Sequence, residues 1–368
     1  MRVLFFSNLI NSGGVASVVK KIAINCCSVD HDFKADIVCY EEPTDDVVGE
    51  LFKYGIDVIV IDRITKNPVK YFFNVLKILK SKRYNAIHTH IEYFNWIPCF
   101  LGKICGVKNR VGHAHGQRGR SNSFLFHFVE YLGRILNCKF TTKRFSCSIA
   151  SGNYVFGKDD FEFLPNFINV DCAQVLTDAQ LKQYRAEFGI KEGALVVGFM
   201  GYLGYEKNPS FVAELAKYCL TVGKKFVFLV AGDGHEKQQL IKSSQECINK
   251  GVIQFLGYRT DNIALLQMFD VLIMPSHSEG MSMALLESQM FGTPCVVSKG
   301  VPNTTDLGVG LYHQAQTFSC EEWVNLISKS LVACKYKTID ERLERLKEIG
   351  YDCETVINRI LESYKFSS

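Results

Sequence analysis

Two glutamates and a run of backbone amides in one short stretch carry the clearest chemical signal in this sequence. The stretch, residues 275–289, follows the apolar residues 270–274, which predict a buried parallel strand. A glycine-containing loop then leads into a helical pattern, so the N–H groups of Gly280, Met281 and Ser282 are expected to point beyond the strand end. Amides at the start of a helix favour an anionic or oxygen-rich ligand.

The two acidic residues of this stretch are Glu279 and Glu287. At helical spacing Glu287 shares a stripe with the apolar Met283 and Met290, where an unpaired buried carboxylate would be costly. Glu287 therefore either caps a neighbouring loop or binds a pair of ligand hydroxyls, such as those of a ribose. In the second interpretation Glu279, eight positions earlier, faces another polyol part of the same ligand.

Two other loops with glycines join a predicted strand to a predicted helix. Gly13 and Gly14 form either a tight turn or a place where backbone amides approach a diphosphate or an acceptor. The dinucleotide fingerprint Gly-x-Gly-x-x-Gly does not occur in this loop. The second loop, residues 201–208, follows a strand and carries Lys207 just before the next helix.

Two His-x-His pairs, His88 with His90 and His113 with His115, lie near the ends of predicted strands. They could supply four ligands to a zinc ion, but only if the two pairs meet in space. Structural histidines are the favoured interpretation, and we predict no metal site. The Asp-x-Asp pattern at residues 30–32 falls in a helix-to-strand loop and is expected at the surface.

The elements that must position these residues alternate between strand and helix in both halves of the chain. Such alternation predicts parallel sheets with right-handed crossovers, which collect ligands at the carboxyl ends of their strands. A segment marked by proline and asparagine near residues 161–170 separates the halves. The predicted fold is therefore α/β, with doubly wound parallel-sheet domains over residues 1–165 and 166–350 and a C-terminal helix in residues 351–368.

The motif Pro-Ser-x-x-Glu-Gly-(x)6-Glu, from Pro275 to Glu287, resembles the donor signature of retaining glycosyltransferases of the GT-B fold, notably glycosyltransferase family 4. The resemblance spans nearly the whole chain and is greatest to bacterial capsule, exopolysaccharide and O-antigen enzymes. It implies two Rossmann-like domains facing a central cleft, the first on the acceptor side and the second binding the nucleotide sugar. The last helix is expected to cross back to the first domain.

The resemblance also implies roles for individual residues. In the family the first glutamate and the following amides hold the donor sugar, and the second glutamate holds the ribose. A lysine and an arginine neutralise the donor diphosphate; Lys207 matches the lysine, whereas Tyr202 stands at the arginine position. The implied catalytic residues are His115, which would approach the donor sugar beside the reacting carbon, Glu279 and Lys207. The implied donor-binding residues are Gly13, Gly14, Tyr202, Lys207, Tyr258, Arg259, Glu279, Gly280, Met281, Ser282 and Glu287.

Composition is ordinary for a globular protein, with 47% hydrophobic and 22% charged residues. The sequence has no apolar run long enough for a membrane-spanning helix, and its first residues are interpreted as a strand rather than a signal peptide. The 14 cysteines form no Cys-x-x-Cys pair, which favours buried free thiols in a reducing cytoplasm.

Charge is unevenly distributed. Residues 1–165 hold 22 Lys and Arg against 15 Asp and Glu, a net +7, and the basic excess gathers in residues 108–144. This cluster is either a solvated face or a surface for anionic lipid headgroups or a phosphate-bearing acceptor. Arg118 and Arg120 are the expected acceptor or membrane contacts, and Arg118 and Arg259 could each replace the missing arginine. No nucleic-acid motif accompanies the charge.

Together these features predict a hexosyltransferase that uses a nucleotide diphosphate sugar, with UDP as the expected nucleotide, and retains the anomeric configuration. The expected acceptor is a polyprenyl-diphosphate-linked saccharide at the inner face of the cytoplasmic membrane, reached as a peripheral protein. No cofactor and no essential metal are expected. A non-catalytic sugar-nucleotide-binding subunit and a UDP-sugar 2-epimerase remain as alternatives.

Overall fold

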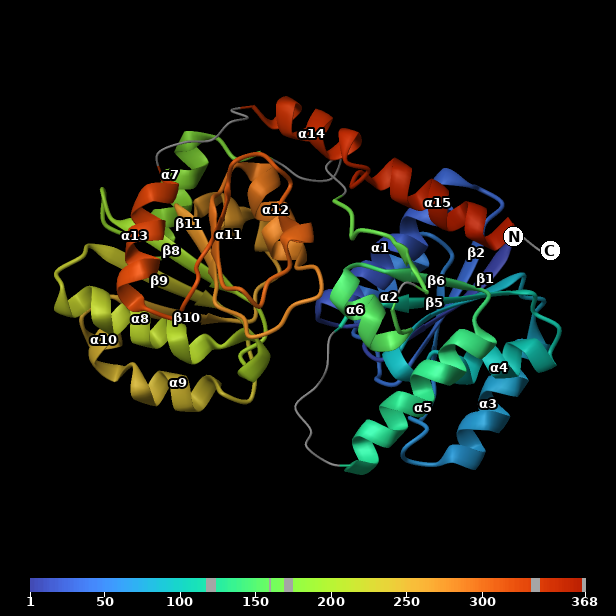
Figure 1. The fold of residues 1–368 in the computed structure, drawn as a ribbon. Helices are drawn as coiled ribbons and strands as arrows, with labels where there is room; N and C mark the ends of the chain where they lie inside the picture. Colours follow the sequence, from blue (N-terminus) through green and yellow to red (C-terminus); the bar gives the residue numbers. More distant parts are fainter. Residues whose placement is uncertain (117–123, 159, 169–174, 332–337, 366–368) are drawn as a thin grey trace. The chain divides into compact units, whose positions relative to one another are not determined.

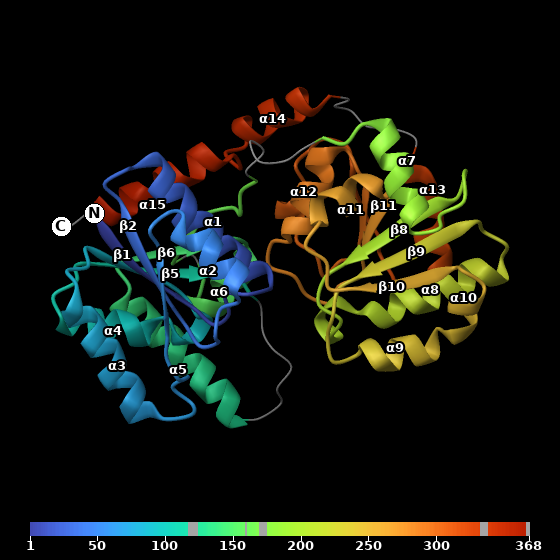
Figure 2. The same cartoon turned by 180° about the vertical axis from the view of Figure 1, so that it is seen from behind.

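The protein consists of two compact units, each built on one parallel β-sheet (Figures 1 and 2). The structure is a computed structural model and describes residues 1–116, 124–158, 160–168, 175–331 and 338–365. The first unit comprises Met1–Asn166 and Cys353–Ser368, and the second comprises Phe167–Asp352. The predicted division after residue 165 differs by one residue from the division between Asn166 and Phe167.

The first unit contains a seven-stranded sheet with the order β3-β2-β1-β4-β5-β6-β7, in which all paired strands are parallel. Its strands are β1 (Arg2–Ser7), β2 (Lys34–Cys39), β3 (Asp57–Val60), β4 (Ala86–His90), β5 (Asn109–Ala114), β6 (Lys143–Ser146) and β7 (Glu162–Phe163). Its helices are α1 (Gly14–Val29), α2 (Asp45–Phe52), α3 (Pro68–Ser81), the 3-10 turn η1 (Glu92–Phe94), α4 (Trp96–Ile104), α5 (Phe124–Phe140), α6 (Ile149–Val155) and α15 (Cys353–Lys365).

Helices cover both faces of this sheet. Helices α3 and α4 pack on one face, where Leu4, Ile87 and Leu101 belong to a common apolar core. Helix α3 begins as its sequence predicts, because Pro68 occupies the first turn and the Asn67 side chain accepts a hydrogen bond from an amide of that turn. On the other side the C-terminal helix α15 packs against α1 and β5 (Figure 1).

The second unit contains a six-stranded parallel sheet with the order β10-β9-β8-β11-β12-β13. Its strands are β8 (Leu195–Met200), β9 (Phe226–Ala231), β10 (Ile253–Gly257), β11 (Val271–Met274), β12 (Cys295–Val297) and β13 (Tyr312–Gln314). Its helices are α7 (Asp178–Glu187), the 3-10 turn η2 (Tyr205–Lys207), α8 (Pro209–Thr221), α9 (Lys237–Ser243), α10 (Gln245–Asn249), α11 (Asn262–Met268), α12 (Met283–Phe291), the 3-10 turn η3 (Asn303–Thr305), α13 (Cys320–Ser330) and α14 (Ile339–Glu348).

Two apolar layers sandwich the second sheet. Helices α8 and α13 pack around the fully buried Trp323, and helices α11 and α12 form the other layer around Leu266 and Leu285. The helical pattern of residues 236–249 predicts one helix, but the structure divides this segment into α9 and α10. The division falls at the buried Ser244, whose backbone angles (φ −101°, ψ 8°) leave the α-helical region.

The predicted fold class, two doubly wound parallel-sheet domains, is confirmed. In each sheet the order of strands reverses at one point, between β1 and β4 in the first unit and between β8 and β11 in the second. Open parallel sheets bind ligands beyond the carboxyl ends of the strands at such a switch point. In the part of the chain that the structure describes, every helix is too short or too polar to span a bilayer.

Candidate functional site

The switch point of the second sheet brings Lys207 and Glu279 together. Lys207 follows β8 and Glu279 follows β11, the two strands on either side of the reversal. The Lys207 Nζ lies 2.5 Å from the Glu279 Oε1, and the Ser276 hydroxyl donates to the same oxygen at 2.6 Å. The Glu279 side chain is only 9% exposed, so this cation and carboxylate interact at the border between protein and solvent.

The backbone around Lys207 explains how the lysine is presented. Asn208 adopts the left-handed conformation (φ 49°, ψ 52°), which asparagine tolerates better than most residues. Pro209 then starts α8, because its fixed φ suits the first helical position. Only Asn208 therefore separates the end of η2 at Lys207 from the start of α8 at Pro209. This short connection holds Lys207 close to the end of β8.

Two further contacts join the loop after β8 to the loop after β11. The His277 amide donates to the Glu206 carbonyl at 2.8 Å, and the Tyr205 and His277 rings stack with centroids 4.6 Å apart. The Glu279 amide in turn donates to the Gly300 carbonyl after β12, at 3.0 Å. The ion pair is thus supported by backbone contacts that do not depend on either of its charges.

Glycines allow the loops at this edge to touch backbone to backbone. Gly232 has φ 149°, and a Cβ there would lie 1.8 Å from the Gly201 carbonyl oxygen. A Cβ at Gly300 would lie 2.3 Å from the Ser276 carbonyl oxygen. Neither position has room for a side chain, so both glycines are required by the close approach of neighbouring loops.

The predicted amides and Glu287 occupy the start and the middle of α12. Gly280, Met281 and Ser282 are buried, and Ser282 is the N-cap of the helix, without a side-chain capping bond. The expectation that Glu287 lies on a buried apolar stripe holds only in part: Met290 is fully buried, whereas Glu287 and Met283, one turn before it, are half-buried. This face of α12 forms the rim of the packed layer, so the carboxylate keeps access to solvent.

The other predicted donor-site residues are more exposed. Tyr202 is 55% exposed, and its hydroxyl lies 3.1 Å from His235 Nδ1. Tyr258 is also exposed. Arg259 forms a bidentate ion pair with Asp261, at 2.8 and 2.6 Å, so it is already engaged by a local carboxylate.

Sequence reasoning missed Lys237, which lies at the start of α9 next to the same edge. Its Nζ pairs with Asp233 at 2.7 Å and lies 3.8 Å from the position of a Cβ at Gly257, the last residue of β10. The Asp233 to Lys237 spacing of four residues was visible in the sequence, but such pairs are common on solvated helix faces.

At the switch point of the first sheet, the loop after β1 carries Gly13 and Gly14. Gly13 has φ 99°, and the space around both glycines is open among the described residues. Sequence reasoning also missed Glu41, whose Oε1 accepts from the Ile10 and Asn11 amides at 2.7 and 2.9 Å. Glu41 therefore holds the start of the glycine loop in place.

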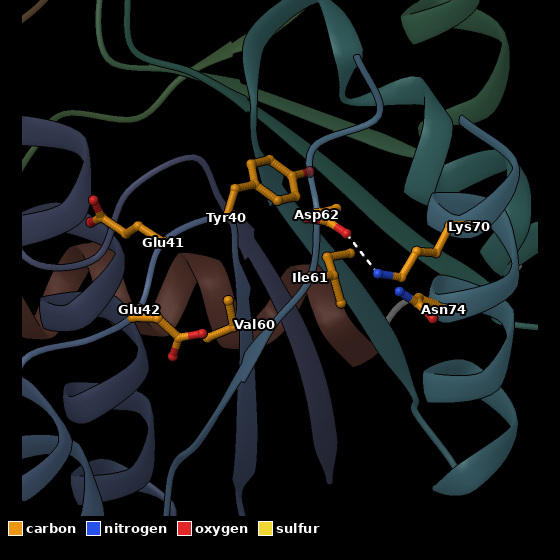
Figure 3. A pocket seen from close by; sticks show the side chains of 8 residues that line it. All are labelled: Tyr40, Glu41, Glu42, Val60, Ile61, Asp62, Lys70 and Asn74. Carbon is orange, nitrogen blue, oxygen red and sulfur yellow. Dashed lines mark hydrogen bonds and ion pairs between the residues drawn. The ribbon is translucent and has the colours of Figure 1, made fainter. Parts of the chain in front are cut away.

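Glu41 also lines a shallow pocket beyond the ends of β2 and β3 (Figure 3). Figure 3 shows Asp62 and Lys70 joined by an ion pair at one side of this pocket, with Glu41 and Glu42 at the other. The predicted donor-site residues do not line it. We assign it no role in donor binding.

The four histidines of the two His-x-His pairs meet in the first unit. His88, His90 and His113 are at most 1% exposed, and His115 is 7% exposed. His90 Nδ1 lies 2.7 Å from His115 Nε2, and the His113 and His115 rings stack at 4.2 Å. Burial lowers the pKa of all four side chains, in His115 to about 3, so the imidazoles are neutral at physiological pH.

Glu92, at the start of η1, holds the segment after β5. Its Oε1 accepts hydrogen bonds from the His115 and Gly116 amides at 3.2 and 3.0 Å. Burial raises the pKa of this carboxyl group to about 7, although the two amides act in the opposite direction. Glu92 also has a positive φ of 56°, an uncommon conformation outside glycine. Glu92 thus positions the backbone of His115.

Comparisons with known proteins show which proteins the chain resembles. A model of the family "Glycosyl transferases group 1" matches residues 181–310. The chain is 25% identical to the Bacillus subtilis protein that carries the name glycosyltransferase EpsF, over 100% of this chain and 97% of that protein. A second relative is the Escherichia coli enzyme named UDP-Gal:alpha-D-GlcNAc-diphosphoundecaprenol alpha-1,3-galactosyltransferase. The chain is 26% identical to it, over 72% of this chain and 71% of that protein. The Anabaena HepE structure in complex with UDP-glucose has the same fold, with a TM-score of 0.79, 17% identity and 99% of both chains covered.

Residues 181–310 therefore form a glycosyl transferases group 1 domain, and the chain is a glycosyltransferase. The predicted resemblance to bacterial polysaccharide enzymes with the GT-B fold is confirmed. The matched residues 181–310 contain both Lys207 and Glu279.

Two arginines of the basic region, residues 108–144, are engaged by other parts of the first unit. Arg118 and Arg120 lie outside the described residues. Arg110 donates to the carbonyls of Phe140, Val107 and Lys108, and Arg144 pairs with Asp160 at 2.5 Å. These arginines fasten loops together and are not free cations, because acids and carbonyls elsewhere in the fold reach them.

Proposed function

We propose that this glycosyltransferase transfers a hexose from a UDP-sugar to a hydroxyl group of a polyprenyl-diphosphate-linked saccharide, with retention of configuration. The observation that carries the proposal is the Lys207–Glu279 pair at the switch point of the second sheet. A cation and a carboxylate placed side by side match the diphosphate and the sugar hydroxyls of one donor molecule. The UDP and UDP-glucose complexes of HepE support the choice of nucleotide.

In this proposal Lys207 offsets the charge that develops on the leaving diphosphate. A lysine ammonium has three N–H donors, so the bond to Glu279 leaves capacity for phosphate oxygens. Glu279, fixed by Ser276 and Lys207, accepts from donor-sugar hydroxyls. The amides of Gly280, Met281 and Ser282 at the start of α12 add oriented dipoles. Such preorganised groups act mainly by stabilising the transition state.

The remaining predicted residues are proposed to bind the nucleoside part of the donor. Glu287, which keeps access to solvent, binds the ribose hydroxyls, and the backbone at Tyr258 and Arg259 meets the base. Lys237 is a second cation beside this edge and, like Arg259, a candidate to replace the missing arginine; each of the two pairs with a nearby carboxylate, Lys237 with Asp233 and Arg259 with Asp261. No side chain is assigned as a covalent nucleophile, so attack assisted by the leaving phosphate is the proposed route to retention.

In the first unit, Gly13 and Gly14 offer an open stretch of backbone at the end of β1, and His115 is the proposed contact beside the reacting carbon. Because the His115 imidazole is neutral at physiological pH, it can orient a hydroxyl or a sugar oxygen without adding charge. The Glu92 carboxylate fixes the backbone that carries it.

A lipid-linked acceptor is supported by two observations. The name of the Escherichia coli relative specifies a diphosphoundecaprenol acceptor. Helix α5 exposes large apolar side chains at helical spacing on one stripe, which are Phe124, Phe128, Tyr131, Leu132 and Ile135. An exposed apolar stripe on a helix is a feature of proteins that lie on a bilayer surface. We propose that α5, with Arg118 and Arg120 in the preceding segment, contacts the membrane.

The donor proposal is tested by a thermal-shift screen of nucleotide sugars, followed by assays of transfer to synthetic polyprenyl-diphosphate saccharides. A true donor is expected to raise Tm, and the product anomer, assigned by NMR, should match that of the donor. Transfer should proceed without added Mg2+ or Mn2+. Binding of UDP with neither transfer nor donor hydrolysis would indicate a non-catalytic subunit. Interconversion of sugar nucleotides without an acceptor would indicate a 2-epimerase.

The membrane proposal is tested by sedimentation with phosphatidylglycerol vesicles. Replacing both Phe124 and Phe128 by glutamate should lower vesicle binding about tenfold or more, because each buried phenylalanine contributes about 1.5–3 kcal/mol. The matched control is Phe52→Glu, which changes an exposed phenylalanine on α2. Equal binding by the double variant and the control would contradict contact through α5.

A further inference from the structure

The four buried histidines described above form a compact cluster that the transfer reaction does not use as a whole. His88 and His90 stand two residues apart on β4, and His113 lies on the neighbouring strand β5. Side chains two residues apart in a strand share one face of the sheet, so parallel pairing of β4 with β5 brings the rings together. Ring centroids lie 4.3 Å apart for His88 and His90, and 5.1 Å apart for His90 and His113. The condition for a metal site that the sequence left open, that the pairs must meet, is fulfilled.

Several ring nitrogens of this cluster are buried with no hydrogen-bond partner among the described residues. They are His88 Nε2, His90 Nε2, both nitrogens of His113 and His115 Nδ1. A buried polar group without a partner costs about 1–3 kcal/mol, so five such atoms within one cluster would be a large uncompensated cost. Buried polar atoms that lack a protein partner point to a ligand, and a metal ion is a ligand that accepts electron pairs from several imidazole nitrogens at once.

We propose that His88, His90 and His113 bind one divalent transition-metal ion of the zinc class. One ring nitrogen from each lies within 4.8 Å of those of the other two, close enough for small ring rotations to bring them onto one ion. Imidazole nitrogen is a preferred ligand of zinc, and three histidines leave a fourth tetrahedral position for water. Metal binding requires neutral imidazole, and the full burial of these three side chains favours the neutral form over the charged one.

The hydrogen bonds behind the ligands favour the same assignment. His88 Nδ1 lies 2.6 Å from the Tyr364 hydroxyl, and His90 Nδ1 lies 2.7 Å from His115 Nε2. If each Nδ1 carries the proton and donates it to these partners, the Nε2 lone pairs of both rings are free for the metal. Metal-binding histidines in proteins usually donate their other N–H in this way, which fixes the tautomer and the ring orientation.

The ion would connect parts of the first unit that are distant in the sequence. Tyr364 belongs to the C-terminal helix α15, so the metal, His88 and Tyr364 together fasten this helix to β4. His90 in turn would fix His115 in the tautomer whose proton is on Nδ1. The proposed ion is structural and has no assigned part in the transfer step.

Metal analysis of the purified protein tests this proposal without any mutation. We expect about one zinc ion per chain by plasma mass spectrometry, and intense visible d–d bands when chelator-treated protein takes up Co2+, as for tetrahedral nitrogen sites. Removal of the metal should lower Tm, and added Zn2+ should restore it. If the wild-type protein holds less than about a tenth of an ion per chain and gives no Co2+ bands, the proposal is overturned.

A pair of variants locates the site. His113→Gln should abolish the Co2+ bands and the Zn2+-dependent rise in Tm, whereas His31→Gln, at an exposed histidine outside the cluster, should leave both unchanged. If His113→Gln does not fold, X-ray absorption at the zinc edge of the wild type replaces it, and should show a first shell of nitrogen and oxygen with outer-shell scattering from about three imidazoles and no sulfur. A first shell that contains sulfur or lacks imidazole, or Co2+ bands that persist in His113→Gln, would place the metal elsewhere and contradict the assignment.

Discussion

The two switch points of this glycosyltransferase use opposite chemistry on the same architecture. Beyond β8 and β11 of the second unit, Lys207 and Glu279 form an ion pair at the border with solvent. The surrounding loops approach each other closely at Gly232 and Gly300, where a side chain would not fit. Beside and beyond β4 and β5 the functional groups are neutral imidazoles and a buried carboxyl group with a raised pKa. The edge of the second sheet therefore presents charged groups, whereas the corresponding edge of the first sheet presents neutral ones.

This difference fits the two parts of the proposed reaction. A departing nucleoside diphosphate accumulates negative charge, which a fixed cation and oriented amides stabilise. A sugar hydroxyl and its neighbours need hydrogen bonds in fixed directions, which neutral histidines can supply at physiological pH. The predictions that follow test whether the two edges respond differently to protons and to mutation.

The largest expected effect is acid destabilisation originating in the first unit. Unfolded histidine has a pKa of about 6.5, whereas the four buried histidines stay neutral when folded, so the unfolded state binds more protons as pH falls. Each should lower the free energy of unfolding by up to about 1.4 kcal/mol per pH unit below 6.5. Glu92 acts with the opposite sign, because its raised pKa makes the folded state bind a proton between about 7 and its unfolded value near 4.5.

The net loss between pH 6 and pH 5 is expected to be about 3–4 kcal/mol, measured by urea unfolding at each pH. A stability that stays constant over this interval would show that the cluster is not kept neutral. Native-state hydrogen exchange should assign the loss to the first unit.

The next largest effect is expected at Lys207, at the switch point of the second sheet. Lys207→Ala should reduce the transfer rate by about 10²–10³-fold, as is usual when one preorganised group at a developing oxyanion is removed. Lys207→Arg should recover part of the rate because it keeps the charge. The control is Lys250→Ala, which removes an exposed lysine paired with Glu246 and should leave the rate unchanged. Equal rates for Lys207→Ala and the control would remove Lys207 from the mechanism.

An effect of intermediate size on stability is expected where the loops of the second unit approach each other at Gly232. Gly232→Ala would place a Cβ 1.8 Å from the Gly201 carbonyl oxygen and should destabilise the protein by about 2–3 kcal/mol. Gly251→Ala is the matched control, because Gly251 also has a positive φ, of 69°, but open space around it. That variant should cost about 1 kcal/mol, from backbone strain alone. Chemical denaturation compares the two, and equal losses would mean that the loops can separate freely.

The smallest effect is expected at Glu92. Glu92→Gln keeps an oxygen acceptor for the His115 and Gly116 amides, so transfer should change less than about threefold, whereas Glu92→Ala should lower it about tenfold. Glu92→Gln should also steepen the acid destabilisation, because it removes the group of opposite sign. Equal activity of the alanine and glutamine variants would show that the carboxyl oxygen does not position His115.

Much of the fold could be predicted from the sequence, because its strands are apolar runs separated by helical patterns. The strands around residues 271–274 and 195–200 were predicted from this pattern alone. The edge strand β13 was not, since three half-buried residues, Tyr312–Gln314, are too few to show a period. The break between α9 and α10 at Ser244 was also missed, because serine is compatible with helix and only its tertiary setting ends the first segment.

The candidate site was predictable in its residue types but not in its pairings. The motif around Glu279 and the Lys-Asn sequence at Lys207 pointed to a diphosphate sugar, yet nothing in their separation of 72 positions shows that the two side chains touch. The meeting of the histidine pairs depended on strand register, and the hydrogen bonds from the His115 and Gly116 amides to Glu92 join residues 23 and 24 positions apart. Such contacts are set by tertiary structure, which local patterns do not encode.

Isothermal titration with UDP and with the preferred UDP-sugar, into the wild type and the Glu279→Ala and Glu287→Ala variants, tests the central assignment most directly. Glu287→Ala should weaken both ligands about 10–100-fold, because both carry the ribose. Glu279→Ala should weaken the UDP-sugar by a similar factor but leave UDP affinity unchanged or higher, because the change removes the sugar contact and frees Lys207 for the diphosphate. Unchanged affinity of both ligands in both variants would contradict the placement of the donor at this edge of the second sheet.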